Sequence, residues 1–271
     1  MPASTTTVAE HRDGMAASLA YTRTGSGEPL VLLHPLGANR QVWRPLFPHL
    51  TAEREVITLD LPGFGDSPAI GEDRTPTPSR LAVSVVKALE ALGLEDAGAH
   101  LAGNSIGGWV ALEAAAAGHA ASVTAIAPAG LWSAPLLPKP QVARQIARVA
   151  SPIIGPAMRS ARLRRAALAG SIHHPERVTA AEATNLIRSY ARAPGMAAVN
   201  RAMRANRFER LADIDVPVTL AWCEYDKLIE HPRTLPDKVS EVWLRGCGHV
   251  PMWDDPQAVA SALLQGSRPR A

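Results

Sequence analysis

The chain has 271 residues, of which 46% are hydrophobic and 20% are charged, and its formal net charge at pH 7 is +3. This ordinary globular composition leaves room for one large α/β domain or two small ones. No apolar run reaches the length of a membrane span, and the first residues resemble no secretory signal, so we expect a cytoplasmic protein. Two cysteines make no disulfide framework, and in such a protein we expect free buried thiols.

The first half of the sequence alternates between short apolar runs and helical patterns. Strands are predicted over residues 17–21, 30–33, 55–59, 99–102 and 123–127, and helices over residues 41–50, 78–92 and 108–117. Repeated strand–helix units of this kind predict a mostly parallel sheet with right-handed crossovers and helices on both faces.

The alternation stops near Leu131 and returns near Val216. The residues between are rich in Arg and Ala, are interrupted by Pro and Gly, and contain no convincing strand pattern. Strands are then predicted over residues 216–222 and 239–244, followed by a helix over 255–264. We therefore predict a core domain made of residues 1–130 and 208–271, with residues 131–207 as a helical insertion.

Charge is distributed unevenly along the chain. Residues 131–210 contain 14 Lys and Arg but 3 Asp and Glu, which leaves the remainder of the chain acidic. A basic segment can indicate nucleic-acid binding, but these arginines are spread along predicted helices and no nucleic-acid motif accompanies them. We therefore expect no nucleic-acid partner and interpret the segment as a solvated helical face on an acidic core.

Residues 103–107, Gly-Asn-Ser-Ile-Gly, form the pattern G-x-S-x-G between a predicted strand and a predicted helix. This context is typical of a nucleophile elbow, in which a sharp turn exposes the serine hydroxyl above the sheet. Glycine permits such a turn because it has no Cβ atom. The pattern makes Ser105 a candidate nucleophile.

A serine hydroxyl needs a base that a third group orients, and two later loops offer these residues. Asp226 follows the strand predicted over 216–222, and His249 follows the strand predicted over 239–244. Both lie just past the carboxyl end of their strand, the edge at which open α/β sheets bind ligands. Glu224 is an alternative acid, whereas Asp254 and Asp255 are expected to cap the last helix.

Four stretches together resemble the α/β-hydrolase superfamily, and within it the capped branch of serine esterases and C–C bond hydrolases. They are residues 33–37, residues 59–67, the motif around Ser105 and residues 246–251. The resemblance implies an eight-stranded, mostly parallel sheet with a helical cap over residues 131–207. It also implies that Ser105 is the nucleophile, His249 the general base and acid, and Asp226 the acid that orients His249. Serine at this position argues against the dehalogenase and epoxide-hydrolase branches, which carry Asp there.

The resemblance further implies an oxyanion hole made of two backbone N–H groups, one of them from Ile106. Members of the family often read His-Gly-x-Gly in the loop that supplies the other. This chain has Pro35 in place of the first glycine, and because proline has no N–H, we expect Leu36 to be the donor. The side chains next to these groups are candidate substrate contacts, namely those of His34, Asn104 and Val250.

The reaction expected of this site is hydrolysis of a small-molecule carboxylic ester through an acyl-enzyme. The adjacent His173 and His174 lack the spacing of metal ligands, and we expect neither a metal nor a cofactor. Apolar residues of the insertion are expected to roof the pocket or to pack the cap onto the core. They are Leu136, Leu137, Ile153, Ile154, Met158, Leu163, Met196 and Met203.

Two other functions remain open from the sequence. A C–C bond hydrolase of vinylogous diketo acids is favoured by Asn104, by Gly107 and Gly108, and by the arginine-rich insertion. Val250 departs from that branch, where an aromatic residue often follows the histidine. The same fold also serves non-catalytic ligand-binding proteins, against which a complete set of catalytic residues argues.

Overall fold

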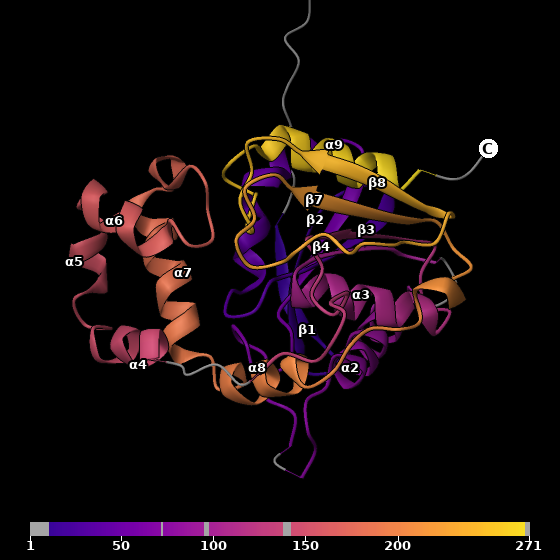
Figure 1. The fold of residues 1–271 in the computed structure, drawn as a ribbon, viewed down its shortest axis with the longest axis horizontal. Coiled ribbons are helices and arrows are strands. Elements are labelled where there is room, and N and C mark those ends of the chain that lie inside the picture. Colours follow the sequence, from indigo (N-terminus) through magenta and orange to yellow (C-terminus); the bar gives the residue numbers. More distant parts are fainter. Residues whose placement is uncertain (1–10, 72, 95–97, 138–141, 269–271) are drawn as a thin grey trace, which may run out of the picture.

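The computed structural model describes residues 11–71, 73–94, 98–137 and 142–268, which form an eight-stranded sheet in the order β1-β2-β4-β3-β5-β6-β7-β8 (Figure 1). The strands are β1 (Arg12–Ala16), β2 (Leu19–Gly25), β3 (Glu28–Leu33), β4 (Arg54–Leu59), β5 (His100–Asn104), β6 (Ser122–Ile126), β7 (Val218–Cys223) and β8 (Val239–Leu244). The β1–β2 and β2–β4 pairs are antiparallel, and all other neighbours are parallel. The predicted mostly parallel sheet with helices on both faces is confirmed.

The parallel strands all end at one edge of the sheet. Ser105 directly follows β5, Asp226 lies in the loop after β7, and His249 lies in the loop after β8. Because β5, β6, β7 and β8 are successive parallel neighbours, their carboxyl ends lie together. The topology therefore gathers residues that are more than a hundred positions apart in the sequence.

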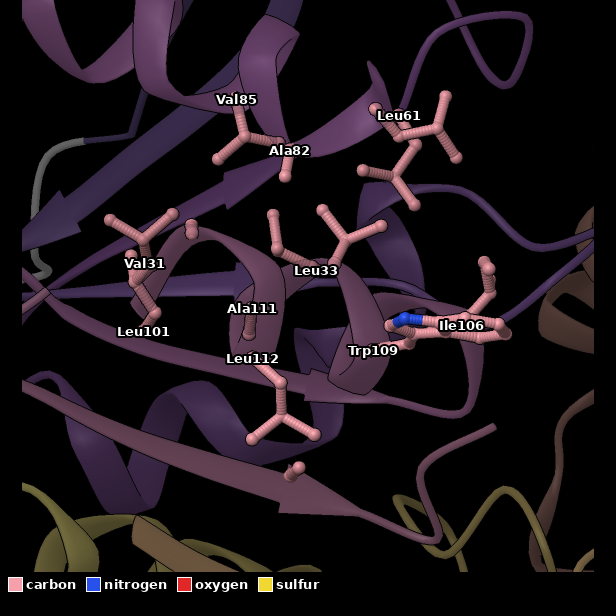
Figure 2. Packing of buried hydrophobic residues seen from close by; sticks show 14 of the residues in the cluster. Val31, Leu33, Leu61, Ala82, Val85, Leu101, Ile106, Trp109, Ala111 and Leu112 are labelled. Carbon is pink, nitrogen blue, oxygen red and sulfur yellow. The ribbon is translucent and has the colours of Figure 1, made fainter. Parts of the chain in front are cut away.

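Helices cover both faces of the sheet, and the side chains of β3 show why. Val31 and Leu33 join one buried cluster with α2 and α3, whereas Leu30 and Leu32 join the opposite cluster with η1 and α9. Figure 2 shows part of the first cluster, contributed by β3, β5, α2 and α3. The helices are η1 (Arg40–Leu46), α1 (Phe47–Leu50), α2 (Pro78–Ala91), α3 (Ile106–Ala116) and α9 (Pro256–Gly266).

The chain between β6 and β7 forms the helical insertion, in whose described residues there is no strand. Its elements are α4 (Val142–Val149), α5 (Ile154–Met158), α6 (Ala161–Leu168), η2 (Pro175–Arg177), α7 (Ala180–Arg192) and α8 (Met196–Arg204), and η3 (Leu211–Asp213) follows it. The helices α4, α5 and α6 all contact α7. Figure 1 shows these helices at one side of the molecule, with α7 between the others and the sheet.

The structure corrects the expected apolar roof. Ile154 and Met158 are buried, but Ile153 and Leu163 are 64% and 50% exposed, and Leu137 is also exposed. The cause is that α5 and α6 turn one side toward α7, so residues on their other side face the solvent. None of the described helices is long and apolar enough to cross a membrane.

Two predicted elements differ from the structure. The strand expected over residues 17–21 begins at Leu19, because Ala17 and Ser18 form a two-residue hairpin turn between β1 and β2. Both turn residues have positive φ, +43° and +76°, as a type I′ turn requires, although neither is Gly or Asn. The helix expected over residues 41–50 is instead the 3-10 helix η1 followed by a single turn of α1, since Pro45 cannot donate a helical hydrogen bond.

The hairpin turn generates a prediction about stability. Glycine adopts positive φ without steric cost, so Ser18→Gly should raise the free energy of unfolding by about 1 kcal/mol and Tm by about 2–4 °C. Urea and thermal unfolding would measure the change. The same substitution in a helix, Ser79→Gly in α2, should lower stability instead. A Ser18→Gly variant that is no more stable than the parent would contradict the turn described here.

Candidate active site

Ser105 occupies the sharp turn between β5 and α3. Its backbone has φ +57° and ψ −119°, a conformation that non-glycine residues rarely adopt and that costs about 1–3 kcal/mol. Hydrogen bonds hold the turn in place: the Ser105 N–H donates to the Ile126 carbonyl at 2.9 Å, and its carbonyl accepts from the N–H groups of Trp109 and Ala129 at 3.1 Å. The strained conformation is therefore fixed by three neighbouring segments of backbone.

The two glycines of the motif allow backbone segments to touch. A Cβ atom on Gly103 would overlap the carbonyl carbon of Gly107, and one on Gly107 would overlap the Leu33 carbonyl oxygen. The first turn of α3 is thus packed directly against the ends of β5 and β3. As a result, Ile106 lies beside the loop that carries Leu36.

The backbone N–H groups of Leu36 and Ile106 are available to a ligand. In the part of the chain that the structure describes, neither donates a hydrogen bond to a protein acceptor. Ile106 is the first residue of α3, where N–H groups have no partner within the helix and the helix dipole favours negative charge. The oxyanion hole that the sequence predicts at these two groups stays a prediction, which the absence of a protein acceptor among the described residues leaves open.

The structure brings Asp226 and His249 into direct contact. Asp226 Oδ2 lies 2.7 Å from His249 Nδ1, and the two side chains are 5% and 6% exposed. Asp226 Oδ1 accepts from the backbone N–H groups of Leu228 and Ile229 at 2.7 and 3.1 Å, which fixes the carboxylate. If Nδ1 donates to this carboxylate, the other ring nitrogen, Nε2, is left with a lone pair that can accept a proton.

The alternative acid, Glu224, is occupied elsewhere. Its carboxylate accepts from the Gly246 N–H at 2.9 Å and lies 3.3 Å from Arg245 Nη1. The hydrogen bond from Gly246, with the nearby Arg245 guanidinium, lowers the pKa of Glu224 below its usual range. Glu224 thus supports the start of the His249 loop, while Asp226 contacts the imidazole itself.

His34 and the loop after β4 brace each other. His34 Nδ1 lies 2.9 Å from the Pro35 carbonyl oxygen, and Nε2 accepts from the Leu61 N–H at 2.9 Å, so both ring nitrogens are engaged with backbone. Burial lowers the pKa of His34, which favours the neutral ring that this pair of contacts requires. Asp60, also fully buried, accepts from the backbone N–H groups of Arg40 and Asp66. These contacts explain the motif at residues 59–67 as support for the loop of Leu36.

Asn104 and Val250 also contact backbone. The Asn104 amide group donates to the carbonyls of Ile126 and His249, each at 3.0 Å, so this buried side chain ties β5 to the His249 loop. Val250 is half-buried, and its N–H donates to the Ser171 carbonyl of the insertion at 2.9 Å. The structure therefore shows both residues positioning the loop that carries His249.

Cys223 and Cys247 are free and buried beside this loop. Burial raises the pKa of Cys247 to about 12 and the pKa of Cys223 still further above its usual range. Since the thiolate is the reactive form of cysteine, both thiols are inert near neutral pH.

Asp254 is a site residue that the sequence did not reveal. Asp255 caps α9 by accepting from the Ala258 N–H at 2.8 Å, but Asp254 does not share this role. Its carboxylate, in a residue 1% exposed, accepts from the backbone N–H groups of Gly248 at 2.8 Å, His173 at 3.1 Å and His174 at 2.6 Å. One carboxylate therefore joins the His249 loop to the insertion.

The same junction contains a ring contact and a close backbone approach. The rings of His173 and Tyr225 are stacked at 4.0 Å with an interplanar angle of 3°. A Cβ atom on Gly248 would lie 2.8 Å from the His173 nitrogen, so glycine is needed where the insertion meets the loop. Among the described residues, no three His, Cys, Asp or Glu side chains lie together as a metal site would need.

Comparison with known proteins adds a family and several relatives. A profile described as alpha/beta hydrolase family matches residues 30–262. An epoxide hydrolase of Mycobacterium tuberculosis is 32% identical over 199 residues, which cover 68% of this chain and 91% of that protein. The dihydrolipoyllysine-residue acetyltransferase component of an acetoin cleaving system from Pseudomonas putida is 44% identical over 110 residues, covering 40% of this chain and 29% of that protein.

Two further similarities concern proteins named for ester or lipid hydrolysis. A pimeloyl-acyl-carrier-protein methyl ester esterase of Aeromonas hydrophila is 41% identical over 98 residues, 36% of each chain. The segments that match this chain thus cover about a third of the length of this esterase and of the acetyltransferase component. The crystal structure of a membrane phospholipase A is similar with a TM-score of 0.73 and 26% identity, covering 97% of this chain and 87% of that one.

The Asp254 junction generates a prediction about stability. In Asp254→Asn one acceptor oxygen is replaced by an NH₂ donor, so at least one buried N–H loses its partner, and the free energy of unfolding should fall by about 3 kcal/mol. Urea unfolding would measure it. Asp255→Asn is the matched control, because Asn caps a helix as well as Asp does and should change stability by less than about 0.5 kcal/mol. Equal effects of the two substitutions would contradict the junction.

Proposed function

Because the chain belongs to the alpha/beta hydrolase family, we propose that it is a serine hydrolase that cleaves carboxylic esters with Ser105, His249 and Asp226. The observation that carries the proposal is the buried hydrogen bond between Asp226 and His249, at the sheet edge where Ser105 directly follows β5. A carboxylate that accepts the Nδ1 proton orients the imidazole and stabilises the imidazolium that forms during catalysis.

In the proposed reaction, His249 Nε2 takes the hydroxyl proton of Ser105 as Oγ attacks the ester carbonyl carbon. The negative charge that develops on the carbonyl oxygen is stabilised by the N–H groups of Leu36 and Ile106. Collapse of the tetrahedral intermediate expels the alcohol, which takes the proton from His249, and leaves an acyl-Ser105 ester. Water, deprotonated by His249, then attacks this ester, and the acid leaves as Ser105 regains its proton.

We propose further that residues 131–207 act as a cap over this site. The contacts of α7 support this role: the Ser189 hydroxyl accepts from Asn39 Nδ2 at 2.8 Å, and a Cβ atom on Gly37 would lie 2.6 Å from the Tyr190 ring. Both contacts fall on the loop that carries the Leu36 N–H. The cap would therefore bound the pocket on the oxyanion side and influence which acyl groups fit.

Ser105 itself distinguishes the proposed ester hydrolysis from epoxide hydrolysis, the reaction for which the mycobacterial relative is named. The resemblance to epoxide hydrolases implies Asp at the nucleophile position, where this chain has Ser105. An epoxide carbon attacked by a serine hydroxyl would give an ether, which water does not readily cleave, whereas an acyl-serine is readily hydrolysed. The ester reaction is therefore the one that Ser105 supports.

The second candidate reaction is hydrolysis of a C–C bond in a vinylogous diketo acid. The observation that favours it is Asn104, which precedes the nucleophile as in that branch and whose amide holds the His249 loop. The two reactions share Ser105 and His249, so they are distinguished by substrate and not by loss of these residues.

Hydrolysis of p-nitrophenyl esters from acetate to laurate tests the proposal. Ser105→Ala should lower kcat by about 10⁴-fold or more, and Asp226→Asn by about 10³–10⁴-fold, since each removes part of the proton-transfer system. Glu224→Gln is the matched control for the acid, because its carboxylate does not contact His249, and it should keep activity within about threefold.

The outcomes separate the candidate functions. Turnover that survives Ser105→Ala would refute the assignment of the nucleophile. A folded protein that cleaves no ester of any chain length but cleaves a diketo acid would establish the C–C reaction. A folded protein inactive on both classes of substrate would support a ligand-binding role instead.

A further inference from the structure

The helix α4 presents an apolar stripe to the solvent. Val142, Ile146 and Val149 are 57%, 64% and 84% exposed, and Ile153, one turn further along the chain, is 64% exposed. Their spacing of three and four residues places the helical members on one face of α4. Six of the eleven large exposed hydrophobic side chains of the described residues lie in the insertion, which is an uneven distribution for a surface.

The surface around this stripe is basic. Residues 131–175 contain seven Lys and Arg and no Asp or Glu. Exposed arginines flank the stripe in the sequence and follow on α6, where Leu163 is also exposed. They are Arg148, Arg159, Arg162 and Arg165. The helices α4, α5 and α6 carry no carboxylate, and Glu176, on η2 beside α6, lies near Arg165 alone of these four arginines.

The stripe and the arginines belong to the layer of the insertion that is farthest from the sheet. The helices α4, α5 and α6 contact α7 with their inner sides, and Arg144, on the inner side of α4, donates to the Ala193 carbonyl at 2.7 Å. Figure 1 shows α4, α5 and α6 outermost, on the side of α7 away from the strands. The exposed side chains of this layer are therefore directed away from the catalytic edge.

We propose that this layer, which we term the outer surface of the insertion (α4, α5 and α6), docks onto an anionic lipid bilayer. Apolar side chains on one helical face, flanked by arginines and with no acidic residue on the same helices, are the features by which helices bind in the plane of a membrane interface. The apolar groups enter the acyl boundary while the arginines pair with anionic headgroups. This proposal concerns attachment and does not depend on the proposed ester chemistry.

The charge pattern favours a bilayer over a second copy of the chain. Symmetric pairing of two copies through this surface would bring the arginines of both copies into one interface, with no acidic residue on α4, α5 or α6 to pair with them. A bilayer needs no complementary shape, and the apolar side chains, more than half exposed, protrude rather than line a groove. Docking in this way would bring the hydrolase to small molecules dissolved in lipid.

Vesicle sedimentation tests the proposal with ether-linked lipids, which contain no ester for the protein to cleave. Vesicles of equal parts phosphatidylglycerol and phosphatidylcholine should bind the full chain, and vesicles of phosphatidylcholine alone should not. The double variant Ile146→Ser, Val149→Ser should lower the partition coefficient by about tenfold. Arg148→Gln and Arg159→Gln should each lower it by about fivefold at low salt, and raising the salt should abolish this difference.

Matched controls lie outside the insertion. Val83→Ser on α2 removes an apolar side chain that is 55% exposed, and Arg74→Gln removes an exposed arginine. Both should leave vesicle binding unchanged. All variants alter exposed side chains, so unfolding curves and turnover of a soluble ester should match the parent protein.

Four outcomes would overturn the proposal. The first is no binding to phosphatidylglycerol vesicles at low salt, and the second is an equal loss of binding in the control variants. The third is a dimer in light scattering that Ile146→Ser, Val149→Ser dissociates, because a second copy would then cover the stripe. The fourth is binding to soluble polyglutamate that is as strong as binding to vesicles and that Ile146→Ser, Val149→Ser does not weaken. This result would favour an acidic protein over a bilayer as the partner.

Discussion

The close contact between the first turn of α3 and the ends of β5 and β3 is the constraint on which the site depends. It exists because Gly103 and Gly107 have no side chains, so that helix and strand backbones meet without intervening atoms. The contact forces Ser105 into its strained turn and sets the Ile106 N–H beside the loop of Leu36. The strained turn at Ser105 thus follows from one steric condition. The remaining site residues are brought to this point by the parallel order of β5, β6, β7 and β8.

The parts of the fold that the sequence predicts are those governed by local patterns. Each buried parallel strand is a short apolar run, and Ser105, Asp226 and His249 follow the carboxyl ends of β5, β7 and β8. The predictions were wrong where the backbone adopts a conformation without the residue types that usually accompany it. Ala17 and Ser18 form a hairpin turn with positive φ, which Asn or Gly at these positions would have indicated. The apolar residues around Pro45 follow a helical spacing, so the pattern predicted one helix where the structure has a 3-10 helix.

Asp254 and the outer surface of the insertion were missed for a different reason. Two consecutive aspartates before a proline predict a helix cap, but only Asp255 has the position to serve as one. Two of the three partners of Asp254, His173 and His174, lie 81 and 80 residues earlier in the chain. Similarly, the apolar residues of the insertion are equally consistent with a roof or with an exposed stripe. The packing of α5 and α6 on α7, which no local pattern encodes, decides which of their sides faces the solvent.

The donors at the Asp254 junction are all backbone N–H groups, and this has a consequence for how such proteins diverge. The hydrogen bonds of the Asp254 carboxylate do not depend on the side chains at positions 173 and 174, although the His173 ring also stacks on Tyr225. An insertion taken from another hydrolase of this kind would have to follow the same backbone path at these positions, but it would not need the same residues there. The junction thus constrains the path of the main chain between the insertion and the His249 loop more than it constrains the residue types there.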